Sequence, residues 1–203
     1  MLTETALWSD LVACLLTSAV TERIAIEAHR RLAAHGLLDP ITVSSRAKYE
    51  HTVADVLRSD SHHGPGYRFP NSRARHIAES WSAAYETPGR GLLPYLRRAV
   101  PEEALRVTLV NRFPGMGFKQ ASLFLTRTGH AVDLVALDTH ILRYLRLRGH
   151  ACDTVSPRSQ KRYLELEGVF RRVTRKWLRP ASVVDFAVWL TMAELSRMRQ
   201  ANA

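Results

Sequence analysis

The residue of this sequence with the clearest potential for chemistry is a lysine just after a glycine-rich turn. Lys119 follows the Pro-Gly-Met-Gly turn at 114–117 by two residues, in the first turn of a helix expected over 119–128. The positive end of a helix dipole opposes a cation there and favours the neutral amine, which is a nucleophile. The alternative is a lysine that holds a phosphate as a point charge. Lys119 is therefore a candidate nucleophile.

A carboxylate lies nineteen residues further on, at Asp138, where a helix that ends near Gly149 is expected to begin. A lysine that attacks a sugar carbon needs such a carboxylate nearby, because it stabilises positive charge on the sugar and helps to manage protons. An ordinary N-cap is the alternative. The intervening helix and loop allow Asp138 and Lys119 to face one cleft. We expect His140 to be packed or hydrogen-bonded beneath this site and not to bind a metal.

The turn itself predicts a phosphate-binding element. Gly115 and Gly117 let the backbone turn sharply, and Met116 can fill the gap between the two helices. Backbone amides at the start of the second helix then form an anion site that suits a DNA phosphate and reads no base. A plain turn is the alternative. The pattern is that of a helix-hairpin-helix over about 103–128.

The elements around these residues are all predicted to be helical, because apolar residues recur at three- and four-residue spacing. About ten helices in one unit are expected, forming two lobes with a central cleft, and no strand pair is evident, although the apolar segment 132–137 could be extended. Gly36 ends one helix, and Asn71 is expected to cap another. The expected helices cover 7–15, 24–32, 44–59, 71–85, 92–99, 101–111, 119–128, 138–149, 157–177 and 181–199.

Charge and composition narrow the class of protein. The formal charge is +10 and the basic residues are 25 Arg and 4 Lys, which predicts a polyanionic partner, most simply duplex DNA, although a basic surface can also serve solubility. No apolar run is long enough to span a membrane, and we expect the protein to be cytoplasmic and associated with the nucleoid. A monomer is the default expectation. Cys14 and Cys152 are too few for a disulfide framework or a cysteine-bound metal cluster and are expected to be free, buried thiols.

The two motifs together resemble a known family. The segments Phe-Pro-Gly-Met-Gly-Phe-Lys-Gln-Ala-Ser and Leu-Asp-Thr-His-Ile-Leu look like the helix-hairpin-helix DNA glycosylases with the Gly/Pro-and-Asp signature (HhH-GPD), in the branch with lyase activity. Residues 11–17, 67–74 and 185–189 resemble parts of the small bacterial and archaeal 8-oxoguanine DNA glycosylase/AP lyases. The resemblance covers about 8–198. Endonuclease III is similar around the hairpin, but its cluster cysteines are missing here.

This resemblance implies roles for individual residues. Lys119 would form a Schiff base and Asp138 would activate it. Trp189 would stack on a flipped base, unless it packs in the core. Asp185, four residues earlier on the same helix face, would contact the base or line its pocket, unless it only complements the helix dipole in the first turn. Phe69 would wedge into the base stack or sandwich the base, unless it is ordinary core. Gly115 and Gly117 would bind phosphate through their amides. Six cations could also hold phosphate, although for each one taken singly a solvated surface position is the simpler interpretation: Arg73, Arg75, Arg171, Arg172, Arg175 and Lys176.

One departure from the family leaves the substrate open. In the subfamily that it most resembles, a lysine after the tryptophan helix reads the oxidised guanine, and no lysine follows Trp189 here. An 8-oxoguanine-like base is the first expectation, and the alternatives are a hypermodified pyrimidine of foreign (phage) DNA, a monofunctional glycosylase that activates water, or a non-enzymatic DNA-binding module. No cofactor or metal is expected for the chemistry, though the hairpin carbonyls could hold a structural monovalent cation.

Overall fold

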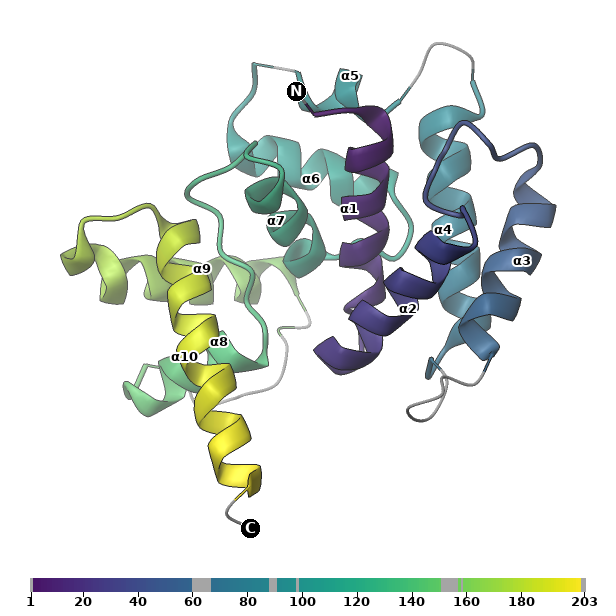
Figure 1. Ribbon diagram of the computed structural model, residues 1–203. Helices are drawn as coiled ribbons and strands as arrows, with labels where there is room; N and C mark the ends of the chain where they lie inside the picture. Colours follow the sequence, from purple (N-terminus) through teal and green to yellow (C-terminus); the bar gives the residue numbers. More distant parts are fainter. Residues whose placement is uncertain are drawn as a thin grey trace. The chain divides into compact units, whose positions relative to one another are not determined.

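The computed structural model describes residues 2–59, 67–87, 91–97, 99–150, 157 and 159–201. Within these ranges all regular structure is helical, which confirms the all-α prediction (Figure 1). The chain divides into two compact units, Met1–Thr128 and Gly129–Ala203.

The first unit is built around its first helix, α1 (Glu4–Leu16), which packs on α2, α4 and α7 (Figure 1). Seven of its thirteen residues are buried, because neighbouring helices cover it on several sides. Buried side chains such as Trp8 and Leu11 supply the centre of this core. The other helices of the unit are α2 (Glu22–Ala34), α3 (Arg46–Arg58), α4 (Pro70–Tyr85), α5 (Leu93–Leu96), α6 (Glu102–Arg112) and α7 (Phe118–Arg127).

Local signals set most of these boundaries, with one exception. Gly36 lies just beyond α2 with a left-handed φ of +68°, as predicted. The prediction that Asn71 caps α4 is wrong, because the helix begins one residue earlier, at Pro70. Proline suits the first helical position, where no backbone N–H is needed. The side chain of Asn71 instead accepts a hydrogen bond from Arg58 Nε at 3.1 Å.

The second unit contains α8 (Thr139–Leu147), α9 (Gln160–Thr174), a short 3-10 helix η1 (Arg175–Trp177) and α10 (Ala181–Ala201). Helix α10 packs on both α8 and α9. The helix expected over 157–177 thus ends as a tighter turn, and Leu178 follows it in the left-handed region at φ +48°. The segment 132–137 has no regular structure, and Leu134–Leu137 within it is buried.

Candidate active site

The expected helix-hairpin-helix is present, formed by α6, α7 and the turn between them. Phe113 and Met116 anchor the turn in the core, with 1% and 3% of their surfaces exposed. Met116 therefore fills the gap between the helices as predicted. Gly115 has a φ of +79°, which a residue with a Cβ adopts only under strain. The turn thus has one geometry, which is fixed by two apolar anchors and one glycine.

The N-terminus of α7 follows this turn directly. Gly117 is the N-cap residue, with extended backbone angles, and no side chain within the described part of the chain caps the helix. No acidic residue occupies the first turn. The positive end of this helix is therefore not neutralised by a local carboxylate, which suits the binding of an anion such as phosphate. Gly115 is exposed and Gly117 is half-buried.

Lys119 is half-buried in the first turn of α7, where its amine contacts the end of α1. Its Nζ donates a hydrogen bond to Thr17 Oγ1 at 3.4 Å. The same hydroxyl donates its own proton to the carbonyl of Cys14 at 2.7 Å. The hydroxyl oxygen can therefore serve Lys119 only as an acceptor, which orients an N–H of the amine toward Thr17. Thr17 lies 102 residues from Lys119 in the chain, and no sequence signal marked it.

The other potential nucleophile near this amine is kept inactive. Cys14 is fully buried as predicted, and this burial raises the pKa of its thiol to about 12. The nearby charges of Arg127 and Lys119 act in the opposite direction but are smaller effects. Since the thiolate is the reactive form, Cys14 does not compete with Lys119 near neutral pH. Cys152, the other expected thiol, lies outside the described residues.

Helix α4 packs beside the hairpin turn. A Cβ added to Gly115 would lie 2.5 Å from His76 Nδ1, and Ser80 Oγ donates to the carbonyl of Pro114 at 3.4 Å. Burial lowers the pKa of His76, and the positive charges of Arg73 and Arg75 lower it further, while Glu79 raises it.

The other residues expected from α4 differ in exposure. Arg75 is exposed and could reach a phosphate. Arg73 is 6% exposed and contacts Tyr67, so its guanidinium is not presented to solvent as a phosphate ligand would be. Phe69, the N-cap residue of α4, is 44% exposed, with the Arg68 guanidinium 5.0 Å from its ring centroid. Phe69 is therefore a surface aromatic residue and not part of the core.

In the second unit, Asp138 is the N-cap of α8 as predicted. Its Oδ1 accepts hydrogen bonds from the amides of His140 at 2.9 Å and Ile141 at 3.0 Å. Oδ2 accepts none from the residues that the structure describes. The two capping bonds fix the orientation of the carboxylate and leave Oδ2 available, so that capping and a chemical role for Asp138 are compatible.

Three rings gather beside the start of α8. Trp189 on α10 is half-buried and meets His140 edge to face, with centroids 5.9 Å apart. Phe186, one turn earlier on α10, is parallel to Trp189 within 6°, with centroids 6.3 Å apart, and is 62% exposed. The three-residue spacing of Phe186 and Trp189 is a sequence signal that places both rings on one face of a helix. His140 is packed against this group, as expected.

Asp185, expected to contact the base or line its pocket, has a hydrogen bond to the backbone in this structure. It is 8% exposed, and its Oδ2 accepts a hydrogen bond from the backbone amide of Ala136 at 2.9 Å. Its carboxylate therefore contacts the backbone of the segment that precedes Asp138. Two other buried side chains, Glu167 and Tyr163, contact the same segment, and no local pattern in the sequence indicates either contact.

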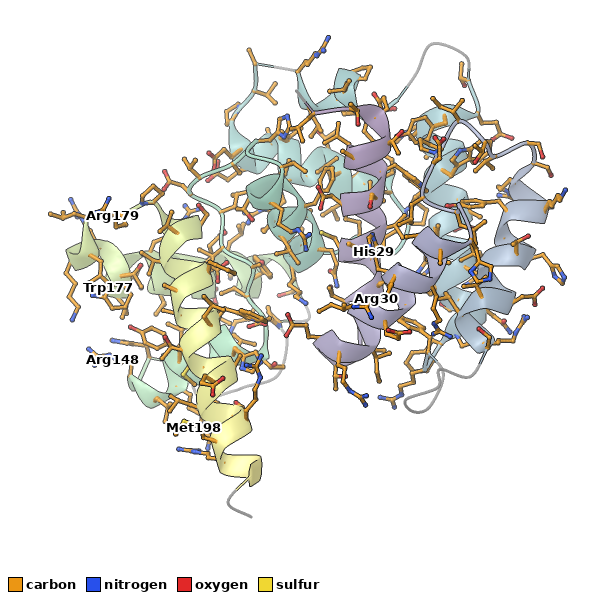
Figure 2. All side chains as sticks on the ribbon, in the orientation of Figure 1. His29, Arg30, Arg148, Trp177, Arg179 and Met198 are labelled. Carbon is orange, nitrogen blue, oxygen red and sulfur yellow. The ribbon has the colours of Figure 1, made fainter. Side chains whose placement is uncertain are left out.

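The remaining cations of this unit are mostly at its surface. Arg171 lies 3.6 Å from Glu167, whereas Arg172, Arg175 and Lys176 are exposed. Figure 2 shows Arg148, Trp177 and Arg179 at the edge of the same unit. No helix among the described residues is long and apolar enough to cross a membrane. The described residues also contain no group of three side chains suited to hold a metal ion.

Comparison with known proteins agrees with this geometry. Residues 2–178 match the sequence profile of the helix-hairpin-helix family described as 8-oxoguanine DNA glycosylase. A protein of Metallosphaera sedula named 8-oxoguanine DNA glycosylase/AP lyase is 34% identical over 125 residues, which are 61% of this chain and 57% of that protein. One of the same name from Thermoplasma volcanium is 29% identical over 91% of this chain and 78% of its own length.

Solved structures agree on the fold. The 8-oxoguanine DNA glycosylase of Thermotoga maritima has a TM-score of 0.71 and 26% identity, over 92% of this chain and 79% of that one. The Methanocaldococcus jannaschii 8-oxoguanine glycosylase/lyase in complex with a 15mer DNA containing 8-oxoguanine has a TM-score of 0.72 and 24% identity, over 92% and 80% of the two chains.

Proposed function

The chain belongs to the helix-hairpin-helix family of 8-oxoguanine DNA glycosylases, and from this membership we propose that it excises a modified base from duplex DNA and cleaves the resulting abasic site. The hairpin amides at Gly115 and Gly117 hold the DNA by its phosphates, together with Arg75. The damaged nucleotide leaves the base stack and enters the protein, as chemistry on a paired base requires.

Lys119 is the nucleophile of the proposed reaction. Its neutral amine attacks C1′ of the sugar, the glycosidic bond breaks, and the bonding electron pair leaves with the base, which takes up a proton. The lysine nitrogen then loses a proton, and the C1′–O4′ bond of the sugar ring breaks as the C=N bond of the Schiff base forms, so that O4′ leaves with the bonding electron pair and takes up a proton. The Asp138 carboxylate stabilises the positive charge that develops on the sugar. Loss of a proton from C2′ of the imine then forms a C2′=C3′ double bond and breaks the C3′–O bond, so that the 3′ phosphate leaves with the bonding electron pair and the strand is cleaved.

The observation that carries this proposal is the environment of the Lys119 amine. The residue is half-buried at the positive end of α7, where the helix dipole opposes an ammonium group, and the hydroxyl of Thr17 orients its Nζ. A lysine that served only as a phosphate ligand would need none of these features. They favour a lysine that acts as an amine over one that acts as a point charge.

We propose 8-oxoguanine as the first base to test, since the relatives carry that name. Trp189 and Phe186 supply ring surfaces for a flipped base in the second unit. A second candidate is a glycosylase for another modified base such as a hypermodified pyrimidine, since none of the residues 190–203 is a lysine.

Borohydride trapping tests the chemistry and the substrate together. Duplexes with an abasic site, 8-oxoguanine, uracil, or an oxidised or glucosylated pyrimidine are mixed with wild-type protein and Lys119→Gln. Lys161→Gln is the matched control, because Lys161 is an exposed lysine in the first turn of another helix, α9. We expect a covalent adduct with wild type and the control, and none with Lys119→Gln.

The possible failures of this test are distinct. Base release without an adduct would replace the Schiff base by a water-activating mechanism that depends on Asp138. Tight DNA binding without base release or an adduct on any duplex would refute an enzymatic role and leave a DNA-binding module. An adduct on the abasic duplex alone would support the lysine chemistry and refute 8-oxoguanine as the base.

A further inference from the structure

The segment that precedes Asp138 is held by an unusual set of contacts. Residues 135–137 are buried but belong to no helix or strand, so their amides cannot pair within regular structure. All three amides instead donate to side-chain oxygens. The acceptors are Glu167 Oε1 at 2.9 Å for Val135, Asp185 Oδ2 at 2.9 Å for Ala136, and Tyr163 Oη at 3.1 Å for Leu137.

The phenol of Tyr163 closes this set. Its hydroxyl donates to the carbonyl of Val135 at 2.7 Å while it accepts from the amide of Leu137. The side chains come from two helices, Tyr163 and Glu167 from α9 and Asp185 from α10. Both helices therefore fix the same three residues of backbone, and we call Tyr163, Glu167 and Asp185 the backbone clamp.

Burial of the two carboxylates of the backbone clamp is unfavourable in free energy, which indicates that the position of residues 135–137 has a function. Glu167 is 2% exposed and Asp185 is 8% exposed. A buried carboxylate is strongly unfavourable unless hydrogen bonds compensate it, and a regular element would satisfy these amides without any carboxylate. A fold that only needed to cover this core could use a strand or helix with apolar side chains. Instead, two buried carboxylates hold irregular backbone, and one of them, Glu167, also lies 3.6 Å from the Arg171 guanidinium.

The residue that follows the clamped segment is Asp138. Its backbone is fixed by the clamp before it and by α8 after it, and its carboxylate is fixed by the amides of His140 and Ile141. Glu167 and Tyr163 are almost fully buried, so they act on Asp138 through the backbone and not on the DNA.

We propose that the backbone clamp positions Asp138 for catalysis, and that Asp185 serves as one of its three members. This inference rests on the proposed function, since it assumes that Asp138 acts in the reaction. A displacement of about 1 Å at a reacting group can lower a rate about 100-fold. Loss of one clamp contact should therefore slow base excision while leaving DNA affinity unchanged.

The test is a double-mutant cycle between Glu167 and Asp138, measured as single-turnover base excision on the duplex that the trapping experiment identifies. Glu167→Leu removes the acceptor, and Glu167→Gln keeps an acceptor oxygen but removes the charge. We expect about a 10- to 100-fold loss of rate in Glu167→Leu with an unchanged Kd, and recovery of most of the rate in Glu167→Gln. The double variant Glu167→Leu with Asp138→Asn should be no slower than Asp138→Asn alone, because one residue acts through the other.

Leu166→Ala is the control for loss of stability. Leu166 is the buried neighbour of Glu167 on α9, and its side chain has no polar atom to offer the segment. All variants are assayed at a temperature where circular dichroism shows them to be folded. An equal loss of rate in Leu166→Ala, or additive effects in the double variant, would overturn the proposal.

Amide hydrogen exchange separates this inference from the proposed function. Residues 135–137 should exchange about tenfold faster in Glu167→Leu than in wild type or Leu166→Ala, with or without catalysis. Unchanged exchange would refute the clamp. A wild-type rate in Asp138→Asn, with faster exchange in Glu167→Leu, would instead refute the catalytic role of Asp138, and with it the positioning role, while the backbone contacts themselves would stand.

Discussion

Replacing Gly115 by alanine should damage the hairpin through two separable effects. The first is the backbone, because a φ of +79° is left-handed and costs a residue with a Cβ about 1–2 kcal/mol. The second is contact with His76, since the new Cβ would lie 2.5 Å from Nδ1 and 2.8 Å from Cγ of the ring. Displacing a packed ring costs about 1–3 kcal/mol. The free energy of unfolding should therefore fall by about 2–5 kcal/mol.

The assay is thermal and urea unfolding followed by circular dichroism. For a chain of this length each kcal/mol lowers Tm by about 2–4 °C, so the expected loss is about 4–20 °C. Gly117→Ala is the matched control two residues away. Gly117 has a φ of −85°, which alanine adopts readily, and its Cβ would meet only the end of the Gln120 side chain, at 3.1 Å. That variant should lose less than about 1 kcal/mol.

A second background separates the two effects. In His76→Ala the ring is gone, so Gly115→Ala should cost only the backbone contribution of about 1–2 kcal/mol. The difference between the two backgrounds measures the contact between the turn and α4. A loss below about 0.5 kcal/mol for Gly115→Ala, or equal losses in both backgrounds, would refute this account of the hairpin.

Two further predictions concern single side chains. Thr17→Val removes the hydroxyl that accepts a hydrogen bond from Lys119 and should slow borohydride trapping about 3- to 10-fold. Thr17→Ser should trap at nearly the wild-type rate, and the Kd for DNA should be unchanged in both variants. An undiminished trapping rate in Thr17→Val would show that this contact is dispensable. In the folded protein the pKa of His76 is below its usual 6.5. As the pH falls, the imidazole therefore takes up a proton in the unfolded chain before it does so in the folded protein. The free energy of unfolding should decline between pH 6.5 and the lower pKa of the folded state. Urea unfolding at pH 7.5 and pH 5 should show a smaller difference in His76→Asn than in wild type, and an equal difference would rule out His76 as a source of this pH dependence.

Much of the fold follows from local sequence signals, because helices are specified by short-range periodicity and by their caps. The hairpin, with Met116 in the core, and the cap at Asp138 were predicted on this basis and are confirmed. The error at Asn71 is of the same local kind, since proline at the first helical position outweighed a good capping side chain.

What the sequence does not show is contact between residues far apart in the chain. Thr17 and Lys119 are separated by 102 residues, and Asp185 and Ala136 by 49, so no helical or strand period links them. Asp185 illustrates the consequence. Its four-residue spacing from Trp189 places both residues on one side of α10. The side chain of Asp185 is nevertheless buried, and its carboxylate accepts a hydrogen bond from the backbone and does not face solvent. Spacing predicts a shared face, and only packing tells what that face touches.

The same electrostatic feature acts in opposite directions on the two residues proposed for the chemistry. Lys119 is the second residue of α7, and Asp138 is the N-cap of α8, so each lies at the positive end of a helix. That end stabilises the negative charge of a carboxylate and opposes the positive charge of an ammonium group. The proposed chemistry requires a carboxylate held in one orientation and a lysine that acts as an amine, and the amides of His140 and Ile141 at the start of α8 hold the carboxylate in this way. Moving either residue to the C-terminal end of its helix would reverse the preference, so the position in the helix is as much a part of the proposed chemistry as the residue type.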